Sequence, residues 1–573
     1  MRNEYPRPDF VRKEWLNLNG SWDFYVGDKQ YEIQVPYVCQ SAMSGIGEKI
    51  TQDRVVYQRR VLVPKDWRKK RIRLNFGAVD YRCRVWVNGC MAGCHEGGQT
   101  SFSFDVTDSL TWEEEVIRVE VWDPLKDESI ARGKQFWEEE SQFIWYTPST
   151  GIWQTVWMEP VEETHFEQIR FTPDIDEGTV RIDYELSLQS ILPCTVEIAI
   201  SFQDDLIFCG RMVAKEYRQT IIVDVFQKKA LNGSFHFTGA YWSPEAPNLY
   251  EAVMTAGEEN HGKDQVMTYF GMRKVEVKNG RIYLNHKPYY QKLVLDQGYW
   301  KDSLITAPDD QSYIDDIKKA KAMGFNGCRK HEKAEDPRFL YWADKLGFIV
   351  WEAMASFWVY TPEAAAAFAK EWAELIRRDY NHPSILVWGM LNESWGVPQI
   401  GTSRVQQSFA KSLYYLAHSL DDTRLVISND GWEMTDTDIC AFHSYQHGKT
   451  EDKRQQDRFR ESLKSVDTLG EIVEKPLFAG RTSYKGQPVM LTEFGGISIA
   501  EEDMEGWGYT SVKNSEFLEE LRRIMEAVSQ ADRICGYCYT QLTDVEQEKN
   551  GLLTSDHQYK FDPEQIKDIQ NLC

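Results

Sequence analysis

Two glutamates follow apolar runs that are typical of strands buried on both faces of a sheet. Residues 385–388 form one such run and lead into Asn392 and Glu393, and residues 488–492 form a second run that leads directly into Glu493. Carboxylates at the ends of two strands of one sheet can face each other across a pocket. Hydrolysis of a glycosidic bond requires such a pair, so these two glutamates are the first candidates for chemistry.

The surroundings of the two glutamates predict different roles. In a retaining glycosidase one carboxylic acid protonates the leaving oxygen, and an ionised carboxylate roughly 5–5.5 Å away attacks the anomeric carbon. Glu393 fits the acid/base role, because Trp388 and Trp395 can desolvate it and favour its neutral form. Glu493 fits the nucleophile, and Tyr445 can donate a hydrogen bond that keeps it ionised. A single glutamate at a strand end can be structural, but the two together favour catalysis.

The elements that must position these residues follow Lys274. Helical segments with a 3.6-residue period alternate there with short apolar strands, which predicts parallel βα units. We expect a (β/α)8 TIM barrel over residues 276–573. The connection between the fifth and sixth strands is short and irregular, so one outer helix is expected to be missing. The eight strands are predicted to begin near Tyr289, Asn326, Phe348, Ile385, Arg424, Asp438, Val489 and Ile534.

Polar side chains follow most of these strands, at the end where a TIM barrel places its chemistry. Asn392 stands beside Glu393, where it can hydrogen-bond the sugar 2-hydroxyl, a contact that strengthens in the transition state. The full set of predicted substrate-binding residues is Asn392, Asp296, His331, Tyr445, Glu352, His443, Lys330, Arg329, Trp507 and Gln541.

Several of these residues have a structural alternative that the sequence leaves open. Asp296 can accept a hydrogen bond from a sugar hydroxyl or serve the fold alone. His331 can bind hydroxyls or brace its loop, and Glu352 and His443 can each tether a neighbouring segment instead of a substrate. Trp507 can stack against a sugar or anchor the loop in which it lies.

Two all-β regions precede the barrel. Over residues 1–160 short alternating runs are separated by turn residues, and the run that ends in Asn88-Gly89 predicts a hairpin; this spacing fits a jelly roll. Residues 161–275 have the size and alternation of an immunoglobulin-like β-sandwich. Neither region contains a catalytic constellation of residues.

Composition limits the class of protein and its partners. The 573 residues include 20 Trp and 28 Tyr, more than packing requires, and sugar-binding clefts use such rings as apolar platforms. The net charge of -23 argues against nucleic acid or an anionic membrane as a partner. Residues 1–5 begin no signal peptide, and no stretch approaches the roughly 18 apolar residues of a membrane span. We expect a cytoplasmic protein with a small-molecule glycoside or oligosaccharide as substrate.

The cysteines do not predict a metal site. Eleven are present, and Cys535 and Cys538 have the C-x-x-C spacing. This pair lies inside an apolar strand candidate, and no second pair completes a zinc site. Free thiols and no bound metal are therefore expected.

At these residues the chain resembles glycoside hydrolase family 2, the family of β-galactosidases and β-glucuronidases. The resemblance covers essentially the whole length, and it implies a retaining mechanism through a covalent glycosyl-enzyme, no cofactor, and compatibility with a homo-oligomer formed through the β domains. The segments that carry the resemblance are 18–24, 85–89, 151–157, 242–250, 269–273, 388–393 and 492–495.

Departures from the family pattern narrow the range of expected substrates. The resemblance implies that β-glucuronidases carry an Asn-x-Lys pair after strand eight for the uronate carboxylate, whereas Glu548-Lys549-Asn550 lacks that arrangement and adds a negative charge. This disfavours an ordinary glucuronidase. Long β-galactosidases of the family have further β domains after the barrel and a magnesium site near strand three. Residues 351–354 lack the metal-ligand pattern, so a metal-independent enzyme is expected.

Three cations lie within residues 329–333, at the predicted end of strand two. They can neutralise nearby carboxylates, or one of them can bind an acidic sugar. We expect a retaining exo-β-glycosidase of the galactoside type. The alternative is a β-uronidase, for galacturonides more than glucuronides, and a non-catalytic carbohydrate-binding protein is a remote third reading.

Overall fold

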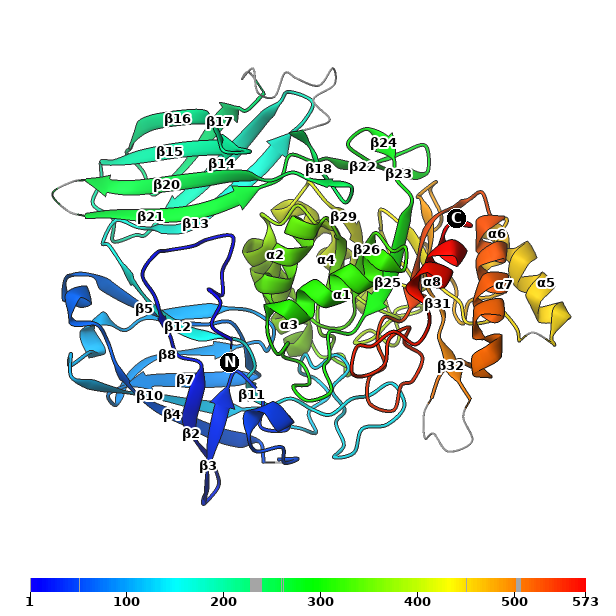
Figure 1. Cartoon of the computed structure of the whole chain (residues 1–573), viewed down its shortest axis with the longest axis horizontal. Helices are drawn as coiled ribbons and strands as arrows, with labels where there is room; N and C mark the ends of the chain where they lie inside the picture. Colours follow the sequence, from blue (N-terminus) through cyan, green and yellow to red (C-terminus); the bar gives the residue numbers. More distant parts are fainter. Residues whose placement is uncertain are drawn as a thin grey trace.

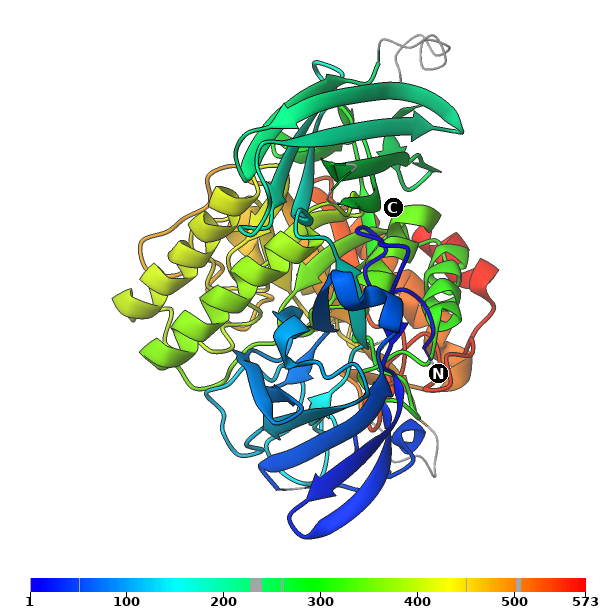
Figure 2. The ribbon, with the colours of Figure 1, turned by 90° about the vertical axis from the view of Figure 1, so that its left-hand side faces the viewer.

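The chain folds into two β domains packed on a TIM barrel (Figure 1). The structure is a computed structural model, and it describes residues 2–50, 52–226, 240–258, 260, 262–449, 451–500 and 507–573. In Figure 2 the immunoglobulin-like domain lies above the barrel and the jelly roll lies below it. This architecture confirms the predicted fold class.

The first domain, blue in Figure 1, is a jelly roll of two main antiparallel sheets. Alternate residues of its second strand, Trp22 and Phe24, point into one core with Leu74 and Val119. The larger sheet has the order β3 (Lys29–Val35), β2 (Gly20–Val26), β4 (Arg54–Leu62), β10 (Glu114–Trp122), β7 (Arg82–Val87) and β8 (Cys90–Glu96). The smaller sheet has the order β1 (Leu16–Asn17), β12 (Val156–Val161), β5 (Arg71–Phe76) and β9 (Phe102–Asp105), and β6 (Val79–Asp80) pairs with β11 (Gly151–Ile152).

The second domain is a β-sandwich with its own core, in which Ile182, Val196 and Met254 are buried. One sheet has the order β13 (Phe166–Asp174), β14 (Thr179–Leu186) and β17 (Arg218–Asp224). The other has the order β16 (Asp205–Ala214), β15 (Cys194–Phe202), β20 (Tyr250–Glu258) and β21 (Gly262–Phe270), and a short pair follows it in β18 (Trp242–Ser243) and β19 (Ala246–Pro247).

The barrel contains all eight predicted strands, arranged in parallel. Their order is β29 (Leu425–Ile427), β28 (Ile385–Gly389), β27 (Ile349–Ala353), β26 (Gly327–Lys330), β25 (Gln291–Asp296), β34 (Ile534–Thr540), β31 (Val489–Gly495) and β30 (Cys440–His443). β29 and β30, the fifth and sixth strands of the barrel, are not hydrogen-bonded to each other, so the barrel is nearly but not fully closed. Residues 428–439 between them are all described and contain no helix, which confirms the expected gap in the outer layer.

Helices cover the outside of the barrel. The third of them begins at Pro362, because the Thr361 side chain accepts a hydrogen bond from the Ala364 N–H and Pro362 occupies the first turn. The helices are α1 (Asp310–Ala322), α2 (Pro337–Leu346), α3 (Pro362–Asp379), α4 (Arg404–Leu420), α5 (Lys453–Ser462), α6 (Val466–Leu469), α7 (Phe517–Ser529) and α8 (Pro563–Gln570).

Two cores result from the alternation of side chains along the barrel strands. Val294 and Cys328 pack outward against the helices, whereas Leu293 and Trp351 fill the barrel interior. A small sheet of β22 (Val275–Lys278), β23 (Arg281–Leu284) and β24 (Lys287–Pro288) contributes Ile282 to this interior core. The other end of the barrel, where its strands finish, therefore remains for the functional site.

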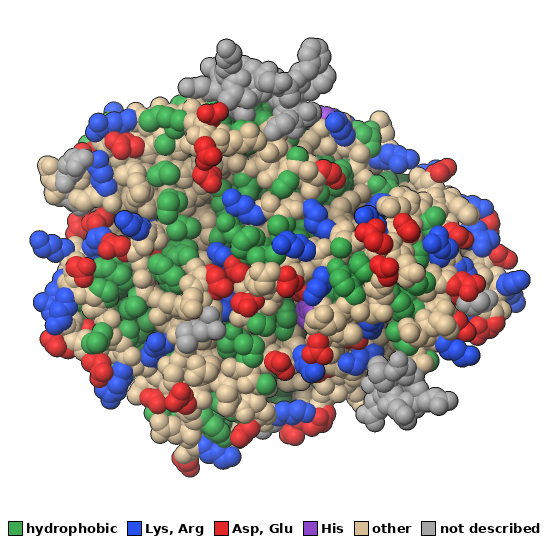
Figure 3. Space-filling model, in the orientation of Figure 1, with side chains coloured by type: hydrophobic (Ala, Val, Ile, Leu, Met, Phe, Trp, Pro, Cys, Tyr) green, Lys and Arg blue, Asp and Glu red, His purple; other side chains and the backbone are tan. Residues whose placement is uncertain are grey.

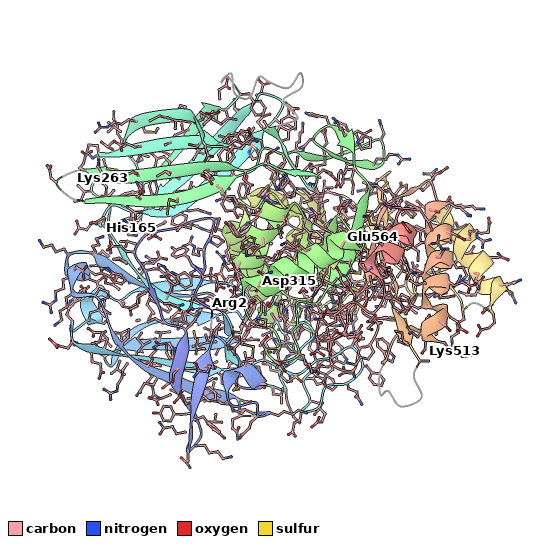
Figure 4. The ribbon with its side chains drawn as sticks, viewed as in Figure 1. Arg2, His165, Lys263, Asp315, Lys513 and Glu564 are labelled. Atoms are coloured by element: carbon pink, nitrogen blue, oxygen red, sulfur yellow. The ribbon has the colours of Figure 1, made fainter. Side chains whose placement is uncertain are left out.

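Buried arginines of the amino-terminal arm join the domains. Arg2, labelled in Figure 4 at the junction of the jelly roll and the barrel, donates to Asp336 at 2.8 Å and to Asp310 at 3.3 Å. Arg12 donates to Asp264 of the β-sandwich at 2.8 Å. Breaking such a buried pair leaves an uncompensated charge, so these contacts fix the amino-terminal arm against both the barrel and the β-sandwich.

On the face drawn in Figure 3, acidic and basic side chains are interspersed despite the net charge of -23. Within the described ranges, no helix has the length and apolar character needed to cross a membrane. All eleven cysteines are described and are free thiols, as the sequence predicts.

Candidate active site

Glu393 and Glu493 meet at the carboxyl ends of β28 and β31. One carboxylate oxygen of each lies within 4.8 Å of the other and of a ring nitrogen of His443. This separation is close to the roughly 5–5.5 Å between the carboxyl groups of retaining glycosidases, and it is well short of the roughly 6.5–9.5 Å of inverting ones. The Glu493 side chain is 6% exposed and the Glu393 side chain 19% exposed, so Glu493 is the more deeply buried of the two.

The backbone around Glu393 has an unusual conformation. Glu393 and Ser394 have φ angles of +49° and +64°, a left-handed region that non-glycine residues rarely adopt. The Glu393 N–H donates to the Asp430 carbonyl at 2.9 Å, and the Ser394 N–H donates to the Asn429 side chain at 3.0 Å. The loop after the fifth barrel strand, β29, therefore holds this turn in place, as is common for strained residues at functional sites.

A bulge directs Glu493 into the pocket. Leu491 and Phe494 on the same strand pack outward against the helices, and the pairing of β31 with β34 shifts register between these two residues. A bulge of this kind re-aims a side chain. As a result Thr492 and Glu493, although consecutive, both make inward contacts, with Asp430 and Arg329 respectively.

Glu493 is held in its ionised form. Arg329 donates to its Oε1 at 2.8 Å, and the Tyr445 hydroxyl donates to its Oε2 at 2.8 Å. Burial opposes ionisation, but the charges of His443 and Arg329 outweigh it and lower the pKa of Glu493 below its ordinary value. An ionised carboxylate with fixed orientation is suited to nucleophilic attack.

Glu393 has the opposite tendency. Burial and then the negative charge of Glu493 raise its pKa above the ordinary value, although the His443 ring, whose Nδ1 lies 2.8 Å from Glu393 Oε1, works against this shift. Two neighbouring carboxyl groups whose pKa values are pushed apart are the pattern expected of an acid and a nucleophile.

His443 lies among three carboxylates. Besides Glu393, its Nε2 lies 3.3 Å from Asp430 and its Nδ1 lies 3.5 Å from Glu493. Burial lowers the pKa of His443, but the three carboxylates outweigh burial and raise it to about 10. Burial opposes the ionisation of Asp430, but the charge of Arg329, followed by His443 and the Thr492 hydroxyl, outweighs it and lowers the pKa of Asp430 to about 2. His443 is therefore a cation that offsets part of the negative charge of the pair.

Asp430 is a site residue that the sequence reasoning missed. It forms an ion pair with Arg329 Nε at 2.7 Å and accepts a hydrogen bond from the Thr492 hydroxyl at 2.5 Å. The sequence pattern could have identified it, because Asn429 and Asp430 are polar residues directly after the fifth predicted strand.

Arg329 joins the two halves of the site. In addition to Glu493 and Asp430, it donates to the Asn392 Oδ1 at 2.5 Å. This bond fixes the orientation of the Asn392 amide and leaves its Nδ2, which is buried and has no partner among the described residues. A buried donor without a partner is costly, and a sugar hydroxyl can satisfy it.

His331 lies beside Glu493. Its Nδ1 lies 3.1 Å from Gln297 Oε1, and Gln297 donates in turn to Gln541 Oε1 at 2.8 Å. Its Nε2 lies 3.6 Å from Glu493 Oε1. Burial and then the charges of Lys134 and Arg329 lower the pKa of His331 well below its ordinary value. A neutral ring that donates from Nδ1 presents an acceptor at Nε2, which has no partner among the described residues, so a hydroxyl group can donate to it.

Aromatic residues line another side of the site. The ring of Tyr445 stacks on that of Tyr509 with centroids 3.5 Å apart, and Trp507 lies 4.8 Å from Tyr509. Trp507 is also tied through its N–H to the Gln547 carbonyl at 2.8 Å. Among the described residues, Trp507 contacts Tyr509, which stacks on Tyr445; these contacts favour the loop-anchor role over direct stacking against a sugar.

Three predicted substrate contacts lie outside the site, because they occupy the outward face of their strands. Asp296 pairs in register with Lys330, whose Nζ lies 2.8 Å from Asp296 and 2.6 Å from Glu335. Glu352 accepts from the Glu335 N–H at 2.9 Å. These predictions are corrected: Asp296, Lys330 and Glu352 are buried in the layer between the strands and the helices.

Of the three cations at strand two, only Arg329 reaches the carboxylate pair. Lys333 is 1% exposed and donates to the carbonyls of Gly298 and Ile305 and to Glu335. Arg329 also bonds carboxylates. All three cations therefore neutralise nearby carboxylates, and none of them is free to bind an acidic sugar.

A lysine from the jelly roll enters the site instead. Lys134 lies in the segment between β10 and β11, and its ammonium lies 5.6 Å from the ring centre of Trp395 and 5.3 Å from that of Tyr146. Trp395 also contacts Trp145 and Trp358, at 5.4 Å and 4.1 Å between ring centres. No sequence pattern identified Lys134, since its segment belongs to another domain.

Three donors of the site could in principle gather around a cation, one each from Glu393, His443 and Glu493. The local charges oppose this. An imidazole must be neutral to bind a metal, and the pKa of His443 is raised to about 10, while Arg329 already occupies Glu493. The geometry suits acid–base and nucleophilic chemistry better than metal coordination.

Sequence-family comparison divides the chain into three matched parts. The description "Glycosyl hydrolases family 2, TIM barrel domain" matches residues 275–570. The sugar binding domain of the same family matches residues 15–156, and a third description, "Glycosyl hydrolases family 2", matches residues 164–273.

Individual relatives are more distant. A β-galactosidase from Thermoanaerobacter pseudethanolicus is 26% identical over 383 residues, which are 64% of this chain and 47% of the relative. The chain spans less than half the length of the first curated relatives it matches. Among solved structures, an uncultured Clostridium sp. β-glucuronidase has a TM-score of 0.77 at 18% identity and covers 100% of both chains. The Bifidobacterium dentium β-glucuronidase complexed with coumarin-3-O-glucuronide has a TM-score of 0.79 at 19% identity and covers 100% of this chain and 98% of that one. These structural likenesses show a shared fold.

Proposed function

Because this chain belongs to glycosyl hydrolase family 2, we propose that it is a retaining exo-β-glycosidase that works by double displacement. One observation carries the proposal: Glu393 and Glu493 present oxygens within 4.8 Å of each other, and their pKa values are shifted in opposite directions. A carbohydrate-binding protein has no need of such a matched pair.

The first displacement joins the sugar to the enzyme. A Glu493 oxygen attacks the anomeric carbon while the bond to the leaving oxygen breaks. The electron pair of that bond stays on the leaving oxygen, which takes the proton of Glu393. The Asn392 Nδ2 and the His331 Nε2 are placed to contact sugar hydroxyls, so they position the ring during attack.

The second displacement releases the sugar. Glu393, now ionised, takes a proton from a water molecule as that water attacks the anomeric carbon from the side that the leaving group vacated. The bond to Glu493 breaks, and its electron pair returns to the carboxylate, which Arg329 and Tyr445 stabilise through the contacts at 2.8 Å. Two inversions give net retention.

For the glycone we propose a β-D-galactoside-type sugar, which is supported by curated relatives named β-galactosidases. A β-uronidase is the second candidate, and structural neighbours named β-glucuronidases favour it. The position of Glu548 bears on this choice. It accepts a hydrogen bond from the Tyr146 hydroxyl and one from Asn550 Nδ2 at 3.2 Å, so the segment after strand eight holds a buried carboxylate in place of the Asn-x-Lys pair.

Trapping of the glycosyl-enzyme tests the proposal. The protein is incubated with 2-deoxy-2-fluoro-β-galactosyl fluoride and with the corresponding galacturonyl fluoride, digested, and examined by mass spectrometry. We expect a covalent adduct on the peptide that contains Glu493, and none in the Glu493→Gln variant. An adduct on another residue, or none with either reagent, contradicts the proposal.

A further inference from the structure

Lys134 is a buried lysine that forms no direct ion pair among the described residues, although its charge acts at a distance on the buried carboxyl of Glu332 and lowers the pKa of that group against the larger effect of burial. The residue is 4% exposed, and its ammonium lies over the rings of Tyr146 and Trp395. Within the described part of the chain, no hydrogen bond or ion pair reaches this ammonium. A buried ammonium that lacks such partners is costly, so its presence needs an explanation.

The segment that carries Lys134 is docked firmly on the barrel. The N–H groups of Arg132 and Gly133 donate to the Ser356 carbonyl at 3.0 and 2.9 Å, and the Lys134 carbonyl accepts from the Tyr146 N–H at 2.8 Å. Gly133 has a φ of +54°, and a Cβ there would lie 2.2 Å from the Glu332 carbonyl oxygen. The backbone thus approaches the loop after β26 as closely as glycine permits, which fixes where the lysine side chain enters.

This entry point is inside the active site. Trp395 follows Glu393 by two residues, and its ring centre lies 5.8 Å from that of His331. The positive charge of Lys134 is close enough to His331 to contribute to the lowered pKa of that ring. Lys134 therefore faces the same space as the residues placed to hold the sugar.

The other cations of the site are already matched. Arg329 bonds Glu493 and Asp430, and His443 lies between those two carboxylates and Glu393. In contrast to Arg329 and His443, Lys134 borders these residues without an ion pair among the described residues.

We propose that Lys134 is a specificity-determining residue that binds a carboxylate carried by the substrate. This inference rests on the proposed function and refines it, since it makes an acidic glycoside the preferred substrate over its neutral counterpart. Aromatic faces on two sides desolvate the ammonium, so a carboxylate that enters gains a charge-assisted hydrogen bond in a site of low polarity. The carboxylate can stand at C6 of the glycone or on the aglycone.

Four substrates separate these two sources. The glycone is either galactose or galacturonic acid, and the aglycone is either 4-nitrophenol or a carboxyl-bearing nitrophenol. We expect the wild type to have a higher kcat/KM for a substrate with an acidic glycone or an acidic aglycone than for the neutral counterpart. We call each such comparison an arm of the experiment. We expect Lys134→Ala to lower the ratio of kcat/KM for the acidic over the neutral substrate of that arm by roughly 100-fold, mainly through KM, because one partner of a buried charge pair is removed. Lys134→Arg should restore part of the preference.

Lys126→Ala is the matched control. Lys126 lies on the same segment, its side chain is 74% exposed, and it pairs only loosely with Glu138 at 3.7 Å, so its loss should leave the ratio within about twofold, as expected of a surface substitution. Thermal unfolding of each variant checks that it is folded. Two measurements use the wild-type enzyme alone. They are the ratio of kcat/KM for acidic over neutral substrates and the relative strength of free galacturonate and free galactose as competitive inhibitors.

The proposal is overturned if the wild type prefers the neutral substrate in both arms, or if Lys134→Ala lowers all four rates by one common factor. Either result leaves the proposed function intact as long as the fluorosugar adduct forms on Glu493. Absence of that adduct with both reagents is the separate result that removes the proposed function.

Discussion

Two groups of buried charges lie on opposite faces of the same barrel strands. Arg329 and Lys330 are consecutive residues of β26, and because side chains alternate along a strand they enter different groups. The inner cluster consists of Arg329, Glu393, Asp430, His443 and Glu493. The outer cluster consists of Asp296, Lys330, Lys333 and Glu335.

The two clusters differ in what surrounds them. In the outer cluster Lys330 lies between Asp296 and Glu335 and over the Phe339 ring of α2 at 4.5 Å, and helices cover it. Beside the inner cluster, Asn392 Nδ2 and His331 Nε2 are buried and have no hydrogen-bond partner among the described residues, and they border the carboxylate pair. Buried charge is thus not a sufficient sign of a functional site, and a buried atom without a partner is not one either, because Glu352 Oε2 next to the outer cluster also lacks one. The inner cluster differs in that its two neighbouring carboxyl groups have pKa values shifted in opposite directions.

The largest expected effect is on the inner side. Glu493→Gln removes the nucleophile, and we expect kcat/KM for an aryl glycoside to fall by at least ~10⁴-fold, as when other covalent nucleophiles are lost. Steady-state kinetics measures this loss. Retention of a tenth of the activity would place the nucleophile elsewhere and would break the contrast between the two clusters.

Glu393→Ala should cost about 10²- to 10⁴-fold, the range of general acid–base catalysis. The loss should be largest for poor leaving groups and smallest for dinitrophenolate, which departs without a proton. Added azide should restore turnover and yield a β-glycosyl azide, because a small nucleophile can replace the activated water. A loss that is equal for all leaving groups contradicts the acid role.

Lys330→Met tests the outer cluster. Lys330→Met removes the ion-pair partner of Asp296 and one of the two partners of Glu335, which keeps Lys333. Breaking a buried pair in this way costs about 3–5 kcal/mol of unfolding free energy. Urea unfolding measures that loss. The kcat of the folded fraction should stay within about threefold, since Lys330 touches no residue of the inner cluster. A change in the ratio of galacturonide to galactoside hydrolysis would show instead that Lys330 contacts the substrate.

The strands and the catalytic pair were predictable because their signals are local. Each barrel strand is an apolar run bounded by polar residues, and Glu393 and Glu493 stand at the ends of two such runs. A strand end, however, does not reveal which face a side chain occupies. Asp296 and Glu352 end their strands as Glu493 does, yet a bulge turns only Glu493 inward, and a shift of one residue exchanges the two faces of a strand.

Lys134 was beyond the reach of the sequence for a different reason. It lies more than 190 residues before Arg329, in a segment without secondary-structure periodicity, and only the docking of Gly133 on the barrel brings it to His331. Contacts between domains depend on packing, and no local pattern encodes them. The sequence left open whether a cation at residues 329–333 binds an acidic sugar, and Lys134 of the jelly roll is the cation that we propose for that role instead.

His443→Gln should move the pH profile of kcat/KM. The wild-type profile is expected to be a bell that requires ionised Glu493 and protonated Glu393. The charge of His443 favours the ionised form of both carboxyl groups, so its loss raises both pKa values and shifts both limbs to higher pH. We expect a loss of roughly 10-fold at the optimum, and a profile with unmoved limbs contradicts the assigned charge of His443.

The smallest effect is expected from Glu352→Gln, next to the outer cluster. Burial and then the charge of Asp379 raise the pKa of Glu352 from its ordinary value of about 4.5 to about 8. The folded chain therefore binds more protons than the unfolded chain between those values, so this group makes the unfolding free energy fall as the pH rises from about 4.5 through about 8. Glutamine cannot ionise, and the fall between pH 5 and pH 8 should become shallower in urea titrations.

In contrast to His443→Gln, Glu352→Gln should leave both limbs of the kcat/KM profile where they are, because Glu352 contacts the Glu335 N–H and not the catalytic pair. The two variants together separate the pH dependence of catalysis from the pH dependence of stability. The inner cluster sets the pH dependence of catalysis, and the carboxyl group on the outer face sets part of the pH dependence of stability. A shifted activity limb in Glu352→Gln would show that the two faces are coupled across the strand.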